Sequence, residues 1–333
     1  MENKRLRKNF RNKLKNKSLK VEYSFIKILT GSDLFLRKLP FMKVKSSNHG
    51  PVIWLVGCIH GDELGGTVVI QEIFKRIRKS LKKGVVYGLP LLNPMGFETS
   101  SRDIVLSNED LNRSFIGKEN GSLAERIANM VFKKIKKTNP TLVLDLHNDW
   151  RKSIPYALVD KIDSKISKET YEKTKEFAKK SGLAVVLDNN FFDTTLTYSM
   201  LENNIPSLTL ELGESEVVNE ENVEIGVKVI MNILSDLGMV DKIDKPFEYA
   251  ISEEIKGKIL VYSSRPLSST SGIIRFLIKP KDYVVVGQPI ARIYNSFGKL
   301  LETLHATQNA LVLGYSDYSV VLPGVAFMAF GVV

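Results

Sequence analysis

Imidazole and carboxylate side chains follow apolar segments of the chain. His60 and Glu63 come after a first segment, which ends at Ile59, and His147 directly follows a second. Two imidazoles and one carboxylate are a usual ligand set of catalytic zinc, which keeps a fourth position open for water. Hydrolysis also needs a carboxylate that accepts and relays a proton. Glu211, near the end of a third segment, is placed for this role, and the pattern predicts a metal-assisted hydrolytic site.

The same residues also have structural interpretations. An H-x-x-E spacing occurs by chance, a histidine after a strand is often a hydrogen-bonded structural residue, and a buried ion pair would also explain Glu211. Glu214, three residues further along, competes with Glu211 for the role of base. Co-occurrence favours the metal site, because the chain has only four histidines and two of them end apolar segments. The other two, His49 and His305, are expected to be structural or solvated.

A polar stretch at residues 95–122 adds positively charged candidates. It contains Arg102 and, further along, the sequence DLNR at residues 110–113. A guanidinium beside an amide can hold a carboxylate at two points, which suits Arg113 and Asn112. A second arginine can face the oxyanion that forms when water attacks a carbonyl. The alternative is a solvated loop whose charges serve solubility.

Apolar runs and amphipathic segments alternate from residue 51 to residue 237. Strands are expected at 51–59, 84–94, 141–146, 184–188 and 205–212, and helices at 66–79, 123–137, 163–181 and 219–237. This alternation predicts an α/β fold with a mixed, mostly parallel sheet and helices on both faces. Ligands of such sheets bind beyond the carboxyl ends of the strands, so His60, His147 and Glu211 are expected in one crevice.

The texture of the sequence divides the chain into three parts. Residues 1–20 form a basic tail, and residues 21–245 are the expected catalytic domain. Residues 246–333 have short apolar runs, frequent glycine and proline, and no helical period, which predicts a C-terminal all-β domain.

Composition excludes several classes of protein. Apolar residues make up 43% of the 333 residues and charged residues 26%, which is typical of a globular protein and not of a disordered one. No apolar run is long enough for a membrane span, and no secretory signal is expected. The single cysteine, Cys58, excludes an internal disulfide and a cysteine-rich zinc site. A cytoplasmic protein is therefore the expectation.

The net charge of +11 resides mainly in the tail. Residues 1–20 contain nine Lys or Arg residues against one acidic residue. A solvated arm is one interpretation, and contact with an anionic partner such as nucleic acid or a membrane surface is the other.

Taken together, these motifs resemble the succinylglutamate desuccinylase/aspartoacylase family. The matching motifs, in order, are HGDE, a loop arginine, DLNR followed by Ser-Phe, DLH and LTLELG. They extend over roughly residues 40–240. The β segment is similar to the lipoyl-like barrel-sandwich domain of the family's deacylase branch, although Lys281 replaces a glycine. The loop after DLNR also departs from the usual F-P-G, since Ile116 stands at the proline position.

The resemblance implies a zinc carboxypeptidase-like fold and a role for each matching residue. His60, Glu63 and His147 would bind one Zn²⁺ ion per chain. Glu211 would be the general base, and Arg102 would stabilise the oxyanion. A final pair, Asn112 and Arg113, would hold the carboxylate of the substrate.

The implied function is zinc-dependent hydrolysis of the amide bond in a small, carboxylate-bearing N-acyl amino acid. One alternative is a metallo-carboxypeptidase that cuts a peptide C-terminus, which an open groove would favour over a cleft covered by the β domain. Another is a non-catalytic binding protein on the same fold. Assembly into a homo-oligomer is left open.

Overall fold

The computed structural model describes residues 19–30, 34, 36–316 and 318–333. Apart from Leu19 and Lys20, the predicted basic tail lies outside these residues. Among the described residues, no helix is long and apolar enough to cross a membrane.

The chain alternates strands and helices up to residue 236 and continues with strands alone. The helices are α2 (Gly65–Ser80), α3 (Pro94–Glu98), the 3-10 turn η1 (Leu111–Arg113), α4 (Leu123–Lys136), α5 (Lys168–Lys180), α6 (Leu196–Glu202) and α7 (Glu220–Asp236). The strands of this part are β1 (Lys20–Thr30), β2 (Leu36–Lys45), β3 (Val52–Gly57), β4 (Val85–Leu89), β5 (Leu142–His147), β6 (Lys152–Ser153), β7 (Pro155–Val159), β8 (Val185–Leu187) and β9 (Ser207–Leu212). The strands after α7 are β10 (Ile259–Ser263), β11 (Gly272–Phe276), β12 (Tyr283–Val284), β13 (Pro289–Tyr294), β14 (Leu300–His305), β15 (Ala310–Tyr315), β16 (Val320–Val321) and β17 (Met328–Val332).

One large mixed sheet organises the molecule. Its strand order is β1-β2-β4-β3-β5-β9-β7-β8-β10-β17-β15-β12, with β6 paired to β15. From β4 to β10 every neighbouring pair is parallel except β9 and β7, which run antiparallel. The predicted mixed, mostly parallel α/β fold is therefore confirmed, and the reversal at β7 turns out to shape the site.

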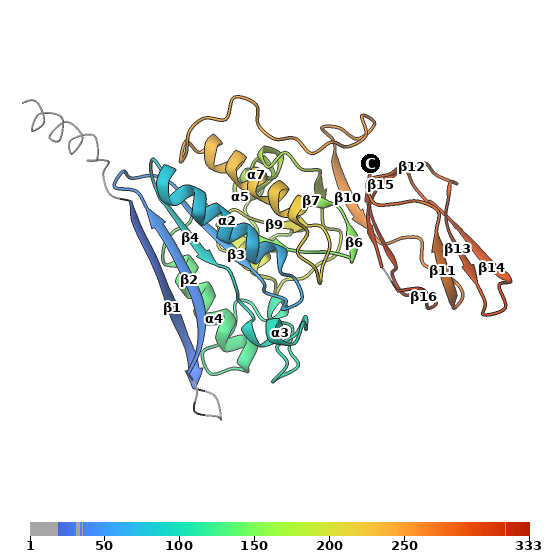
Figure 1. Cartoon of the computed structure of the whole chain (residues 1–333), viewed down its shortest axis with the longest axis horizontal. Helices are drawn as coiled ribbons and strands as arrows, with labels where there is room; N and C mark the ends of the chain where they lie inside the picture. The colour runs from blue at the N-terminus through green and yellow to red at the C-terminus, as the bar shows by residue number, and fades with distance from the viewer. Residues whose placement is uncertain (1–18, 31–33, 35, 317) are drawn as a thin grey trace, which may run out of the picture.

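Helices cover both faces of the sheet. Helices α2, α5 and α7 cover one face of the sheet (Figure 1). Their apolar side chains share one core with side chains of β3, β5 and β9. Helices α4 and α6 cover the other face, where alternate residues of the same strands join a second core. Capping fixes where these helices begin: Ser122 and Glu125 form a capping box for α4, and the Thr195 hydroxyl caps α6.

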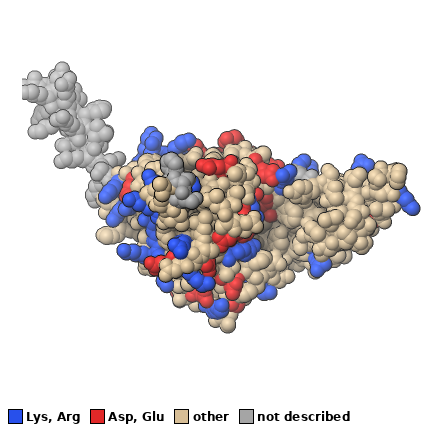
Figure 2. Space-filling view, turned by 90° about the horizontal axis from the view of Figure 1, so that it is seen from below, with Lys and Arg blue, Asp and Glu red and all other residues tan. Residues whose placement is uncertain are grey.

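The C-terminal strands build a β sandwich that is continuous with the main sheet. Strand β10 pairs parallel with β8, and β17, β15 and β12 follow it. A second, antiparallel sheet, β14-β13-β11-β16, packs on these strands around a separate apolar core. Figure 2 shows that this projecting lobe carries few charged side chains compared with the α/β body. The domain boundary at residue 246 stays a prediction, because sheet hydrogen bonds continue across it.

Candidate active site

All seven predicted site residues line one cavity. His60 follows β3, Glu63 lies two residues before the start of α2, His147 ends β5, and Glu211 lies in β9. These four share a cavity of about 320 Å³ with the three residues of the polar stretch: Arg102, Asn112 and Arg113. Register explains part of this meeting, because His147 and Glu211 are direct partners across the parallel pair β5–β9.

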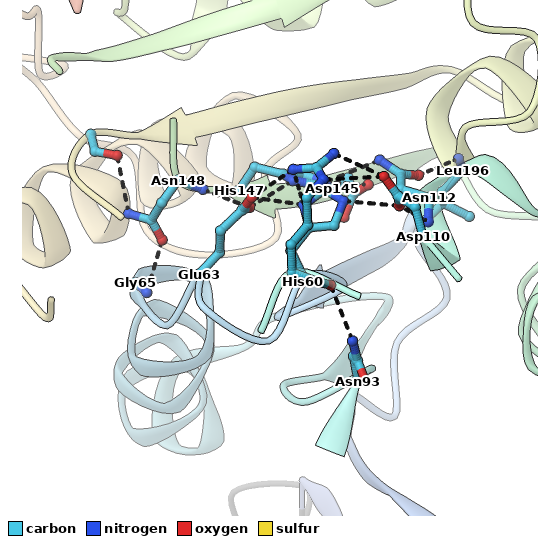
Figure 3. Close-up of polar contacts among 12 residues, drawn as sticks. His60, Glu63, Gly65, Asn93, Asp110, Asn112, Asp145, His147, Asn148 and Leu196 are labelled. Atoms are coloured by element: carbon cyan, nitrogen blue, oxygen red, sulfur yellow. Dashed lines mark hydrogen bonds and ion pairs between the residues drawn. The ribbon is translucent and has the colours of Figure 1, made fainter. Parts of the chain in front are cut away.

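Two of the predicted zinc ligands, His60 and His147, converge on the third, Glu63 (Figure 3). Nδ1 of His60 lies 2.7 Å from Oε1 of Glu63, and Nδ1 of His147 lies 2.8 Å from Oε2. One donor atom from each of the three buried residues lies within 4.8 Å of the others. Two imidazole nitrogens and a carboxylate in this arrangement can hold a metal ion.

The other ring nitrogen of each imidazole, Nε2, lies within hydrogen-bond distance of a second carboxylate. Nε2 of His60 lies 3.2 Å from Oδ1 of Asp110, and Nε2 of His147 lies 3.0 Å from Oδ2 of Asp145. A carboxylate at Nε2 favours the tautomer whose Nδ1 has a free lone pair, which is the form that binds a metal. The donor set therefore fits zinc. The sequence analysis assigned no role to either aspartate.

Glu63 is also fixed by Asn148, a residue that the sequence analysis missed. The backbone amide of Asn148 donates to Oε2 of Glu63 at 3.0 Å, while its side-chain oxygen accepts from the amide of Gly65 at 3.0 Å. Its side-chain nitrogen donates to the backbone oxygens of Gly213 and Glu214. Asn148 thus joins three segments by hydrogen bonds: the turn that carries His60 and Glu63, the end of β5, and the turn after β9.

Two glycines allow the segment around His60 and Glu63 to pack closely against neighbouring backbone. A Cβ atom on Gly61 would lie 2.0 Å from the carbonyl carbon of Gly96, and one on Gly66 would lie 2.6 Å from the carbonyl oxygen of Leu146. Neither position has room for a side chain. Gly61 therefore lets its turn pack on α3, and Gly66 lets the first turn of α2 pack directly on β5, beside His147.

Arg102 lies beside the metal-binding cluster. Its Nε and Nη2 atoms donate to Oδ2 of Asp110 at 3.2 and 3.0 Å, and its Nη1 atom lies 3.6 Å from Oε1 of Glu63. The neighbouring carboxylates of Asp110 and Glu63 raise the pKa of this guanidinium despite its partial burial. A permanent positive charge therefore sits beside the Glu63 carboxylate.

Asn112 and Arg113 line the same cavity from the 3-10 turn η1, which directly follows Asp110. The side-chain oxygen of Asn112 accepts from the amide of Leu196, which fixes its nitrogen 3.5 Å from Nε2 of His147. The Cζ atom of Arg113 lies over the ring of Phe192, 4.1 Å from the ring centroid. The guanidinium donates one hydrogen bond, to the backbone oxygen of Asn112. Most of its donors are therefore available to a ligand.

Glu211 is buried against the cavity, and its Oε2 atom has no hydrogen-bond partner among the described residues. Burial raises the pKa of this carboxyl well above its usual range, Asp149 raises it further, and His147 opposes the shift. Its competitor Glu214 lies outside the cavity lining and accepts a hydrogen bond from Asn219, the N-cap residue of α7. The geometry thus favours Glu211 as the group that meets a reacting water.

The C-terminal part also contributes to the cavity. Tyr262, from strand β10, lines it together with Glu211 and Asp149. This residue comes from the segment predicted to be a separate domain, and nothing in its sequence marked it as part of the site.

A family model for the succinylglutamate desuccinylase/aspartoacylase catalytic domain matches residues 49–237, which is more than half of the chain. The chain belongs to this family. One family relative is the N-alpha-acetyl-L-2,4-diaminobutyric acid deacetylase of Halomonas elongata. It is 28% identical over 283 residues, which cover 83% of this chain and 80% of the relative.

Solved structures of the family share the fold over nearly the whole chain. The succinylglutamate desuccinylase/aspartoacylase of Rhodobacter sphaeroides matches with a TM-score of 0.78 at 20% identity, covering 95% of each chain. The product-bound ectoine utilization protein EutE (DoeB) of Ruegeria pomeroyi matches with a TM-score of 0.79 at 21% identity, covering 96% of this chain and 97% of its own. The agreement includes the C-terminal β strands.

Proposed function

We propose that this protein is a zinc-dependent deacylase that hydrolyses the amide bond of a small N-acyl amino acid. The observation that carries the proposal is the convergence of two Nδ1 atoms on Glu63, with Arg102 and Glu211 in the same cavity. Membership of the family and the deacetylase name of the Halomonas relative support removal of an acyl group from nitrogen. His60, Glu63 and His147 would hold the metal.

The residues of the cavity account for the steps of such a hydrolysis. Lewis-acid chemistry at the amide carbonyl and a more acidic water are what zinc supplies when bound. Glu211 accepts a proton from the attacking water, whose oxygen bonds to the carbonyl carbon. Arg102 stabilises the negative charge on the carbonyl oxygen. The C–N bond then breaks, the proton passes from Glu211 to the leaving nitrogen, and a carboxylate and an amine are released.

The size of the cavity favours small substrates over peptides. A volume of about 320 Å³ is at the lower end of ligand pockets and suits a single acylated amino acid. Tyr262 of strand β10 forms part of its wall, so the C-terminal strands contribute to the cavity, which supports the small-substrate hypothesis. Arg113, beside Asn112, would bind the α-carboxylate of the substrate.

Metal content and turnover test this proposal together. We expect about one zinc ion per chain and chelator-sensitive hydrolysis within a panel of N-acetyl, N-succinyl and N-formyl amino acids. The variants His60→Ala and His147→Ala should lose the metal, because each removes one of three protein ligands. The matched control His305→Ala, at an exposed position in β14, should keep it. Zinc bound without turnover on any panel member, or full metal content in the ligand variants, would contradict the proposal.

A further inference from the structure

Phe192 contacts the arginine that would hold the substrate carboxylate. The Cζ atom of Arg113 lies 4.1 Å from the centroid of the Phe192 ring. Phe192 belongs to the segment of residues 188–195, which connects β8 to α6, and both side chains line the cavity. The phenylalanine is 41% exposed, so burial in an apolar core does not explain its position. The contact with the guanidinium is therefore the feature to be explained.

Hydrogen bonds fix the segment 188–195 beside the turn η1. The amide of Leu196, which begins α6, donates to the side-chain oxygen of Asn112 at 2.9 Å. The amide of Phe115 donates to the backbone oxygen of Thr194 at 3.0 Å. These two bonds involve the residue before Arg113 and a residue shortly after it. The backbone thus brings the ring and the guanidinium together.

The guanidinium of Arg113 lies near negative charge without forming an ion pair. Burial lowers its pKa, and the charges of Asp110 and Asp188 oppose this shift. Among the described residues, however, no carboxylate oxygen lies within 4.0 Å of the guanidinium nitrogens. Its one hydrogen bond goes to the backbone oxygen of Asn112 at 3.0 Å. The remaining N–H groups can therefore bind a carboxylate that enters the cavity.

We propose that Phe192 is a positioning residue that keeps Arg113 available to the substrate carboxylate. This inference rests on the proposed function, since it concerns how that site binds its substrate. An arginine side chain has many conformers, and holding it in one of them before the substrate arrives lowers the cost of binding. The face of an aromatic ring attracts a guanidinium and leaves the N–H groups at its edge free to donate.

Asp188 is the competing partner that the ring keeps from pairing with Arg113. It lies on the same segment as Phe192, and it also lines the cavity. The positive charge of Arg113 stabilises its carboxylate. A direct ion pair between Asp188 and Arg113 would occupy the guanidinium, and the substrate carboxylate would lose its partner. The ring of Phe192 thus favours the arrangement in which the guanidinium stays unpaired.

Phe192→Leu tests the contact, because leucine removes the aromatic face and keeps an apolar side chain. In the zinc-loaded full-length protein, we expect KM for the fastest N-acyl amino acid of the panel to rise about 3–10-fold, with kcat changed less than about twofold. The primary amide of the same compound, tested as substrate or as competitive inhibitor, should show no such loss. Phe192→Tyr, which retains the aromatic face, should restore the wild-type KM.

Phe191→Leu is the matched control on the same segment. Phe191 is 49% exposed, lies outside the cavity lining, and contacts Tyr198 edge-on with the ring centroids 5.4 Å apart. Its replacement should leave KM unchanged. Zinc content and circular dichroism identify any variant that has not folded. A wild-type KM in folded Phe192→Leu, or an equal loss for the amide, would overturn the inference.

Asp188→Asn tests the proposed competition directly. In the wild-type background it should change KM little, because Arg113 is not paired with Asp188 there. In the Phe192→Leu background it should recover most of the lost affinity, because the competing carboxylate is gone. The two changes should therefore be non-additive by at least about threefold in KM. Additive effects would contradict the competition.

Binding measurements separate this inference from the proposed function. Calorimetry on the zinc-loaded Glu211→Gln protein, with and without Phe192→Leu, should show weaker binding of the N-acyl amino acids in the double variant and equal binding of their primary amides. This result, without turnover of any substrate by the wild type, would contradict the deacylase function and leave the role of Phe192 standing. Turnover with a KM that Phe192→Leu leaves unchanged would do the reverse.

Discussion

At the scale of single residues, Glu63 is the group on which the site depends most. Its two oxygens face the imidazoles of His60 and His147, and Asn148 and Arg102 contact or flank the same carboxylate. Its charged form is stabilised chiefly by the two imidazoles, which lower the pKa of this carboxyl despite complete burial. A buried carboxylate between two imidazole nitrogens can bind one metal ion together with them.

Glu211 gives a prediction at the same scale. Glu211→Gln should keep zinc and lower kcat roughly 10²–10⁴-fold, because an amide cannot accept the proton of the attacking water. In the wild type, activity should fall with decreasing pH as the carboxylate is protonated, since burial raises the pKa of Glu211 and only its ionised form acts as base. Steady-state kinetics between pH 5 and pH 9 measure both effects.

The control for this prediction is Glu214→Gln. Glu214 lies three residues away, outside the cavity lining, and accepts a hydrogen bond from Asn219, the N-cap residue of α7. Its replacement should therefore leave the fall in activity at low pH unchanged. Two results would contradict this assignment: full activity of Glu211→Gln, or an activity of Glu214→Gln that no longer falls at low pH. Either result would make Glu214 the candidate base.

At the scale of elements, close contact between α2 and β5 positions the ligands. We expect Gly66→Ala to destabilise the protein by about 1–3 kcal/mol, although alanine is normally the better helix former. The added methyl group would lie 2.6 Å from the backbone oxygen of Leu146 and would push α2 away from His147. Urea unfolding and zinc affinity measure the two consequences. The control Lys75→Ala, at an exposed position of α2, should change neither, and an unaltered Gly66→Ala protein would contradict this account.

The sequence predicts the candidate metal ligands and the base because these residue types occur where apolar runs end. His60, His147 and Glu211 end or follow continuous apolar runs, and parallel strands bring their carboxyl ends together. The presence of Asp160 in the cavity lining was not predicted, since this residue reaches the site only through the antiparallel placement of β7. Strand order and direction arise from long-range pairing, which no local period encodes.

Short elements were missed for a related reason. Strand β7 and helix α6, five and seven residues long, were not predicted, although Thr195 is a good helix N-cap. Both lie in the interior, where burial on all sides removes the alternation between polar and apolar residues. Strands β1 and β2, which lie before the first predicted strand, form a long antiparallel pair.

At the scale of the whole molecule, the main sheet connects the α/β part to the C-terminal strands. Strand β8, only three residues long, is paired on one side with β7 and on the other with β10. A core of residues from both parts, including Ile154, Tyr156, Val186 and Leu260, lies at this junction. The two parts are therefore expected to stabilise each other.

Truncation tests this expectation. A chain ending at residue 245 should aggregate or fail to bind zinc, because it exposes the junction core and leaves the edge of β8 unpaired. The full chain, in contrast, should show concerted loss of hydrogen-exchange protection in β8, β10 and β17 as denaturant is added. A soluble truncated protein that unfolds cooperatively at the full-length midpoint would establish an independent catalytic domain.

The reversal of β7 against β9 has a further consequence for the range of substrates. Glu211 and Asp160 both line the cavity, and Asp160 lies four residues along the chain from Tyr156, the strand partner of Glu211. Strand geometry places those positions roughly 13 Å apart along the backbone. Hydrogen bonds between the paired strands hold this separation fixed. The sheet itself therefore limits the length of a substrate that fits between the two positions.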